Sequence, residues 1–224
     1  MPESDAEAKV NQELYPDLEA MGGLTTAIMV TLSKKMPLEV PVYPGGEGVT
    51  AAKIHSDRGV ISVLLGVEKR LFYISISAET HPWTSGSTES IDSAIDVISE
   101  WLNGLTLSDL AARFPFMSHD PLAEAYEKGD PIEAQWELLL NDGTYASLRP
   151  LLLAVCANSS LRARFPYVSH GRLRLARDPL SRSLDEIWAT PLSGGAYRVE
   201  TPQCPSSAAE YKTISDVVNA MDCI

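Results

Sequence analysis

The clearest hydrophobic pattern in the chain is helical and lies between residues 88 and 104. Its apolar side chains recur three and four positions apart, which places them on one face of a helix. Thr88 or Ser90 can cap the start of this helix, and Asn103-Gly104 ends it. The predicted buried face consists of Ile91, Ala94, Ile95, Ile98, Trp101 and Leu102.

A second helical pattern covers Tyr15–Met36, with an interruption at Gly22-Gly23 and a stop at Pro37. Residues 1–14 are polar and acidic and are expected to form a flexible tail. Residues 37–49 contain three prolines and three glycines, which predicts a loop. The buried face of this second helix is expected to consist of Leu24, Ala27, Ile28 and Leu32.

Between these helices the pattern changes to that of strands. Three are predicted, at Ala51–His55, Val60–Leu65 and Leu71–Ala78, and the third alternates strictly between apolar and polar residues. The short turns between them predict an antiparallel meander, because parallel strands need long crossovers. The helix of residues 91–102 is expected to lie across this meander.

The C-terminal part shows the same order of elements. Strands are predicted at Arg172–Arg177, Ile187–Thr190 and Ala196–Glu200, and a closing helix runs to Met221 from either Ser206 or Thr213. The sequence therefore predicts an α+β protein with two similar three-strand-plus-helix antiparallel layers.

The predicted halves cover residues 15–105 and 161–224, and a helical connector over residues 106–160 joins them. Both halves are expected to pack as one compact unit. The side chains of the connector expected to turn inward are Trp136, Leu139, Leu152 and Val155.

A repeated decapeptide links the two halves. LAARFPFMSH at 110–119 and LRARFPYVSH at 161–170 are identical at seven of ten positions. Two interpretations stay open. Either both copies have only a structural role, in which the proline ends a helix, or the copies form two pseudo-equivalent sites that each offer Arg, Ser and His. His119 and His170 are therefore weak candidates for catalytic residues, and no other catalytic residue is identified.

The negative net charge of the chain disfavours some classes of binding partner. The formal net charge is −12 and the pI is near 4.7, which disfavours nonspecific binding to nucleic acid or to an anionic membrane. No apolar run approaches the ~20 residues that span a bilayer, and the acidic start MPESDAEAKV does not resemble a signal peptide. A cytoplasmic location is expected.

Cysteine and histidine usage predicts no metal site and no cofactor. The three cysteines, Cys156, Cys204 and Cys223, form no CxxC pair and are read as free thiols in a reducing compartment. The four histidines include no HxH or HExxH pattern. Residues 45–48 lack the Lys-Ser/Thr of a phosphate-binding loop.

Arginine is unevenly distributed. Six of the eleven arginines lie between residues 162 and 182, where Asp178 is the one acidic residue. Arg172 and Arg174 alternate with leucines, so a strand would place both on one face. Guanidinium groups suit carboxylate or phosphate, which makes Arg164, Arg172 and Arg174 candidate ligands for an anion. The alternative is a solvated strand face that the protein's own Asp and Glu residues neutralise.

The segment from His81 to Gly86 is expected to be a loop that presents Trp83 next to small hydroxyl residues. Loops on a rigid scaffold often carry binding residues, so Trp83 is a further candidate for ligand contact. It is equally consistent with a side chain that covers the edge of the core.

Several stretches resemble an actinobacterial family generally labelled "natural product biosynthesis protein", and the likeness extends from about Tyr15 to Val218. The resemblance implies a cytoplasmic accessory protein of a secondary-metabolite pathway, including peptide-derived ones. It identifies no catalytic residue. The stretches are YPDLEAMGGL (15–24), WTSGSTES (83–90), EWLNGLTLSDL (100–110), ARFPFM (112–117), EKGDPIEAQW (127–136), LRARFPYVSHGRLRLAR (161–177) and GGAYRVE (194–200).

Together, the arginines and the resemblance predict an accessory protein or a cofactor-free enzyme that binds a small acidic intermediate or a peptide. The alternative is a binding or adaptor module, including an immunity-like role, without chemistry. Homodimer formation is left open.

Overall fold

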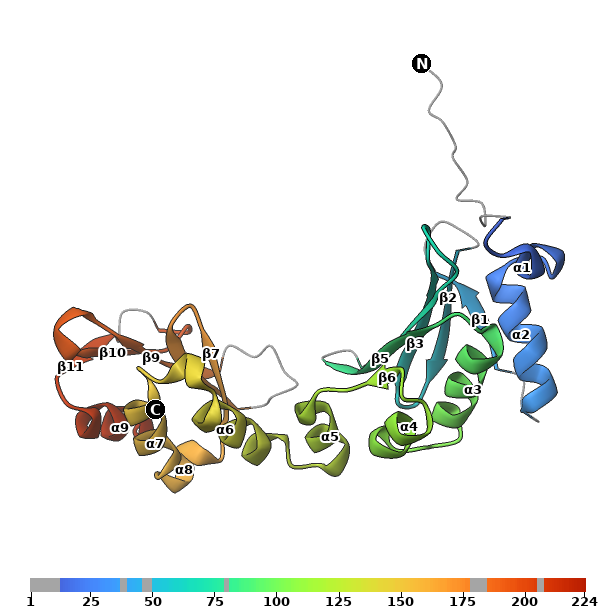
Figure 1. The fold of residues 1–224 in the computed structure, drawn as a ribbon. Helices are drawn as coiled ribbons and strands as arrows, with labels where there is room; N and C mark the ends of the chain where they lie inside the picture. The colour runs from blue at the N-terminus through green and yellow to red at the C-terminus, as the bar shows by residue number, and fades with distance from the viewer. Residues whose placement is uncertain (1–12, 37–39, 46–49, 79–80, 178–184, 205–207) are drawn as a thin grey trace, which may run out of the picture. The chain divides into compact units, whose positions relative to one another are not determined.

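The computed structural model describes residues 13–36, 40–45, 50–78, 81–177, 185–204 and 208–224. Its chain divides into two compact units, residues 1–127 and 128–224 (Figure 1). Both combine helices with an antiparallel sheet, which confirms the predicted α+β class. Among the described residues, no helix is both long and apolar enough to cross a bilayer.

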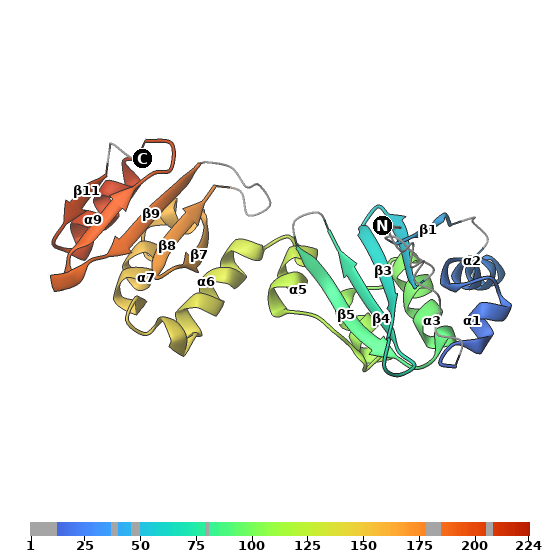
Figure 2. The same ribbon diagram turned by 90° about the horizontal axis from the view of Figure 1, so that it is seen from above.

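The first unit contains, among its described residues, an antiparallel sheet of six strands in sequential order, β1 to β6. Its helices pack on one face of this sheet, and α3 lies behind the strands in Figure 2. The elements are α1 (Pro16–Ala20), α2 (Leu24–Lys35), β1 (Val42–Pro44), β2 (Ala51–Ser56), β3 (Gly59–Leu65), β4 (Phe72–Ser77), β5 (Pro82–Thr88), α3 (Ile91–Leu102), α4 (Leu107–Arg113), β6 (Met117–Ser118) and α5 (Pro121–Lys128).

The predicted helices of this unit are confirmed. Ser90 caps α3, since its hydroxyl accepts a hydrogen bond from the amide of Ser93 (3.2 Å). Gly22 and Gly23 separate α1 from α2 with positive φ angles of 86° and 101°, a conformation that glycine adopts without strain. All four residues predicted on the inner face of α2 are buried.

The segment predicted as a loop from His81 to Gly86 is instead mostly strand β5. It pairs with β4 on one side and with β6 on the other. Proline, glycine and serine are rare in strands, and here the pairing on both sides outweighs their low propensity. Gly86 allows the close approach of β6, because a Cβ there would lie 2.2 Å from the carbonyl oxygen of Phe116.

The second unit contains, in its described part, a five-stranded antiparallel sheet in the order β11-β10-β9-β8-β7. The helices α6 to α9 lie on one side of it, below the strands in Figure 1. The elements are α6 (Pro131–Asn141), a 3₁₀ turn (Gly143–Tyr145), α7 (Arg149–Cys156), α8 (Ser159–Arg162), β7 (Phe165–Ser169), β8 (Arg172–Ala176), β9 (Glu186–Pro191), a 3₁₀ turn (Ser193–Gly195), β10 (Tyr197–Glu200), β11 (Ala209–Tyr211) and α9 (Ile214–Asp222).

Three of these strands, β8, β9 and β10, were predicted, and β7 and β11 were not. The closing helix begins at Ile214, with Thr213 as its cap (3.2 Å to the amide of Asp216). Its other predicted start, Ser206, lies outside the described residues. The residues predicted as a connector supply helices to both cores: Leu107 and Leu110 of α4 to the first, Trp136 of α6 and Leu152 of α7 to the second.

Both sheets therefore have one face covered by helices and a second face that no described helix covers. The sequence decides which side chains line each uncovered face, since successive residues of a strand point to opposite sides. These two faces are therefore accessible to ligands or partners over their described residues.

Candidate functional site

The uncovered face of the second sheet carries two of the predicted ligand residues. In β8, Leu173 and Leu175 point into the core and are fully buried. Arg172 and Arg174 consequently point to the opposite face, as the alternation predicted. On the next strand the same face carries Trp188, the register partner of Arg174.

A row of four side chains crosses this face in register. Tyr167 on β7 is opposite Arg174 on β8, which is opposite Trp188 on β9, which is opposite Glu200 on β10. The Arg174 guanidinium carbon lies 4.5 Å from the Trp188 ring centroid and 5.7 Å from that of Tyr167. These distances are within the range of cation–π attraction. The guanidinium of Arg172 lies 5.7 Å from the same indole.

Glu186 fixes the two aromatic side chains. Its carboxylate accepts a hydrogen bond from the hydroxyl of Tyr167 (2.6 Å) and another from Nε1 of Trp188 (2.6 Å). Burial, and then this hydrogen bond to Glu186, raise the pKa of Tyr167 above its usual value. Tyr167 is therefore neutral at physiological pH and acts as a hydrogen-bond donor.

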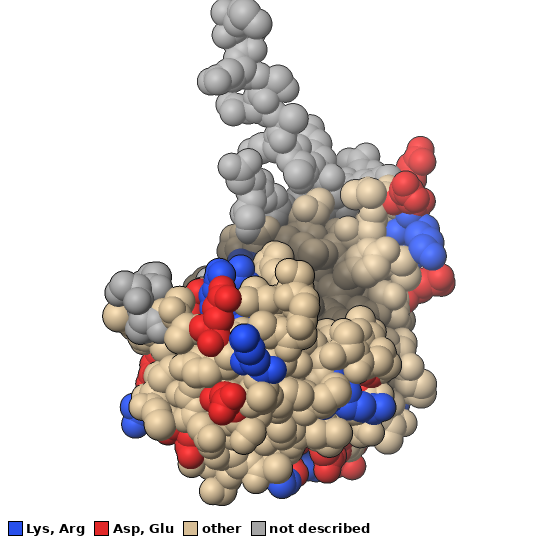
Figure 3. Space-filling view, turned by 90° about the vertical axis from the view of Figure 1, so that its left-hand side faces the viewer, with Lys and Arg blue, Asp and Glu red and all other residues tan. Residues whose placement is uncertain are grey.

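Among the residues that the structure describes, the arginines of the 162–182 segment do not form a surface of free positive charge. Each has a carboxylate within ion-pair distance, and on the face drawn in Figure 3 basic and acidic side chains are interspersed. Arg182 and Asp178 lie outside the described residues. The ion pairs are Arg162–Glu133, Arg164–Asp185 (3.6 Å), Arg172–Glu200 (3.3 Å), Arg174–Glu186 (3.9 Å) and Arg177–Asp185 (3.5 Å).

These pairs neutralise the arginines without using all of their hydrogen-bond donors. The 3.9 Å contact between Arg174 and Glu186 exceeds hydrogen-bond distance. Nε of Arg174 is buried and has no hydrogen-bond partner among the described residues, and the same is true of Nη1 of Arg164. A buried donor without a partner is costly. Neither atom is exposed to solvent, so an external acceptor would have to approach the part of the Arg174 side chain that remains accessible (21% exposed).

The two histidine candidates lie in different units and different surroundings. His119 follows β6 in the first unit, with Nε2 3.8 Å from Glu124. His170 is exposed in the turn between β7 and β8, at a positive φ of 52°. Its Nδ1 lies 2.9 Å from the hydroxyl of Ser169. In the described part of the chain no carboxylate pairs with His170, so nothing there orients it as a catalytic base.

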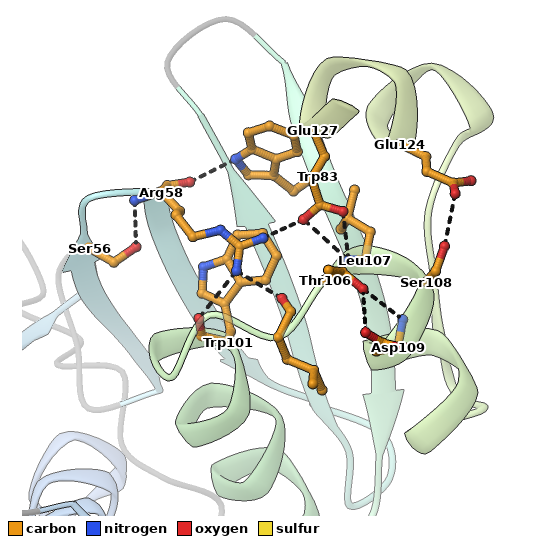
Figure 4. A network of polar contacts seen from close by, with 11 residues as sticks. Ser56, Arg58, Trp83, Trp101, Thr106, Leu107, Ser108, Asp109, Glu124 and Glu127 are labelled. Carbon is orange, nitrogen blue, oxygen red and sulfur yellow. Dashed lines mark hydrogen bonds and ion pairs between the residues drawn. The ribbon is translucent and has the colours of Figure 1, made fainter. Parts of the chain in front are cut away.

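Trp83 belongs to the first unit, where its polar atom is already engaged. Its Nε1 donates to the carbonyl of Arg58 (2.7 Å), and the Arg58 guanidinium lies 3.6 Å from the Trp101 ring centroid (Figure 4). The rings of Trp83 and Trp101 are 6.1 Å apart. Trp83 thus helps to hold the first core together, although it also borders a pocket of about 460 Å³ next to His55.

The uncovered face of the first sheet has a different character, which was not predicted from the sequence. The hydroxyl side chains of Ser75 on β4, Ser85 on β5 and Ser118 on β6 lie opposite one another in register. They border a groove of about 410 Å³. The one sequence signal for this face was the alternation of apolar and polar residues in β4. The groove is lined by Leu64, Tyr73, Ile74, Ser75, Ser85, Gly86, Ser87, Phe116 and Ser118.

No group of three His, Cys, Asp or Glu side chains that could hold a metal ion occurs among the described residues. The three cysteines are free thiols, and burial raises the pKa of Cys156 above its usual value. A raised pKa disfavours the thiolate, so Cys156 is a poor nucleophile.

Family models match only part of the chain. Residues 130–221 match the model described as "Family of unknown function (DUF6193)". No curated protein and no solved structure matches the chain. The matched region coincides closely with the second unit and contains the whole row from Tyr167 to Glu200. The unit that bears the arginines is therefore the part of the protein that is similar to this family.

Proposed function

We propose that the protein is an accessory protein of a natural-product pathway and binds a carboxylate-bearing intermediate or peptide. The binding surface is the uncovered face of the second sheet, around Arg172, Arg174 and Trp188. The observation that carries this proposal is the state of Arg174, whose guanidinium lies beside two aromatic rings. Its side chain is 21% exposed and makes a contact with Glu186 that is too long for a hydrogen bond. A ligand carboxylate would accept from such a planar group of donors.

Two further features support a ligand of this class. The aromatic rings beside the guanidiniums offer apolar contact area, which small-molecule sites combine with a few fixed polar groups. The resemblance to proteins labelled "natural product biosynthesis protein" supports an intermediate of secondary metabolism, including a peptide-derived one. The proposed role is one of binding, because among the described residues no carboxylate pairs with His170 and Nδ1 of His119 is buried without a hydrogen-bond partner.

The test is a titration of the full-length protein with acetate, inorganic phosphate and a short peptide with a free carboxyl terminus. Amide chemical shifts of the second sheet are recorded. We expect the peptide to shift the resonances of β8 and β9, and Arg174→Gln to weaken binding about tenfold, as for the loss of a charge-assisted hydrogen-bond pair. The proposal is wrong if no carboxylate-bearing probe shifts these resonances.

Arg198→Gln is the matched control. Arg198 lies on β10, on the same face as Glu200, and pairs with Glu210 at the exposed edge (2.8 Å). The variant removes the same charge from the same face but leaves the aromatic row intact. Equal weakening by both variants would mean that the overall charge matters and that Arg174 forms no specific site.

A second candidate is an adaptor role for the first unit, in which the groove on its sheet receives a partner protein. The observation that favours it is the exposure of two large side chains at this groove, Leu64 and Tyr73 (50% and 46% exposed). The substitution Tyr73→Ser should then abolish partner binding and leave the peptide response of the second unit unchanged. Loss of the peptide response instead would contradict the assignment of the two roles to separate units.

A further inference from the structure

The charges on the uncovered face of the second sheet cancel in pairs. Arg172 lies 3.3 Å from Glu200, Arg174 lies 3.9 Å from Glu186, and Arg198 lies 2.8 Å from Glu210. A ligand that carries only negative charge would approach these carboxylates as closely as it approaches the arginines. Like charges that are brought together at an interface oppose binding. A simple anion therefore gains little binding free energy from this face.

The carboxylates cannot move aside easily. Both oxygens of Glu186 are held by Tyr167 and Trp188, and the side chain of Glu200 is mostly buried (18% exposed) beside Arg172. The face thus presents fixed positions of both signs. Fixed groups of opposite charge favour a ligand with a matching pair of charges.

The strand register gives the separation of these positions. Arg174, Trp188 and Glu200 lie opposite one another on three consecutive strands, in the order cation, aromatic ring, anion. Neighbouring strands are about 4.8 Å apart, so the backbones of Arg174 and Glu200 are roughly 10 Å apart. An extended peptide covers this distance with about three residues, at roughly 3.4 Å each.

We infer that the ligand is a zwitterion of short-peptide size, with its carboxylate at Arg174, its ammonium group at Glu200 and an apolar side chain over Trp188. This inference rests on the proposed function, because it specifies the ligand class of the same face. It excludes phosphate and small polyacids as preferred ligands. It also gives Glu200 a role in binding, besides neutralising Arg172.

The test compares three peptides on the full-length protein: Gly-Phe-Gly with free ends, its N-acetylated form and its C-terminal amide. We expect the free peptide to bind about twofold to fivefold more tightly than either blocked form, the range for loss of one partly exposed charge pair. Glu200→Gln should remove the preference over the acetylated peptide, and Arg174→Gln the preference over the amide. Glu210→Gln is the matched control and should change neither preference.

The two proposals fail in different ways. Equal affinity for the free and the N-acetylated peptide would overturn the zwitterion inference and leave a carboxylate-binding face. A lack of response to every probe with a free carboxylate would overturn both. The comparison of peptides on the wild-type protein needs no variant, so it decides the matter even if a substitution at Arg174 or Glu200 impairs folding.

Discussion

Arg70 illustrates how a single side chain connects distant parts of the first unit. Its guanidinium binds both carboxylate oxygens of Asp17 (2.7 and 2.8 Å) and also donates to the carbonyls of Leu14 and Glu89. It lies 5.3 Å from the ring centroid of Tyr15. The planar fork of arginine permits all these contacts at once, and lysine could not reproduce them.

This pairing predicts a pH-dependent contribution to stability. The hydrogen bond from Arg70 lowers the pKa of Asp17 below its usual value of 3.8. A lowered pKa in the folded state means that the stabilisation is fully present above pH 3.8 and is lost as the pH falls through the folded-state pKa. Asp17→Asn should therefore lower the free energy of unfolding at pH 7 by at most about 1 kcal/mol, because both side chains are partly exposed.

Urea unfolding of wild type and Asp17→Asn at pH 7, 5 and 3 measures this effect. The difference between the two proteins should shrink towards pH 3. Asp57→Asn serves as the control, since Asp57 is an exposed carboxylate with no ion pair among the described residues. A difference that stays constant over this pH range would show that Asp17 acts through packing and not through its charge.

At the scale of elements, Arg58 holds together the ends of three helices (Figure 4). Its Nη1 donates to the carbonyl of Leu105 (2.8 Å), after the end of α3, and its Nη2 pairs with Glu127 near the end of α5 (2.5 Å). Glu127 in turn accepts from the amide of Leu107 at the start of α4 (3.0 Å). The ion pair thus satisfies backbone groups that helix ends leave without partners.

We expect Arg58→Lys to lower the free energy of unfolding of the first unit by about 1–3 kcal/mol, as a part-buried network loses several hydrogen bonds. Lysine keeps the charge but cannot reach these partners together while stacking on Trp101. Denaturation followed by tryptophan fluorescence and circular dichroism measures the loss. Arg113→Lys is the control: Arg113 is more exposed, and its pair with Glu100 (2.7 Å) should change stability by less than about 0.5 kcal/mol.

At the scale of the whole molecule, the second unit has the parts of an independent domain. Its sheet and its buried cluster come entirely from residues after Lys128, and the family match begins at residue 130. Domains with a core of their own can in general fold alone. The first unit has a separate cluster built from residues before Lys128.

A fragment of residues 128–224 is therefore expected to fold in isolation. Its amide spectrum should be as well dispersed as that of the same residues in the full chain, and its thermal unfolding should be cooperative. A fragment of residues 1–127 is the natural comparison. An unfolded 128–224 fragment would mean that its core depends on the first unit.

The fold class and several elements could be predicted because their signals are local. The spacing of apolar residues in α3 and the caps Ser90 and Thr213 lie within a few positions of the structure they determine. The strands β1, β5, β6, β7 and β11 escaped prediction because they are short or rich in proline, glycine and serine, and β1 lies within the residues predicted as a loop. Their pairing with longer strands holds them in place, and that pairing is not a local property.

The candidate site was predicted in part. Alternation along β8 identified the face shared by Arg172 and Arg174, but the roles of Trp188 and Glu186 could not be read from it. Trp83, predicted as a further ligand contact, lies in the other unit and hydrogen-bonds to Arg58.

The sequence by itself determined the periodicity of each element, the concentration of arginine and the side of β8 on which two arginines lie. The tertiary structure decided which carboxylates neutralise them, because Glu133 and Glu200 are 29 and 28 residues away from their partners Arg162 and Arg172. It also decided that Arg174, Trp188 and Glu200 form one row. The three residues of this row meet only through strand register, and register depends on the packing of a whole sheet against its core.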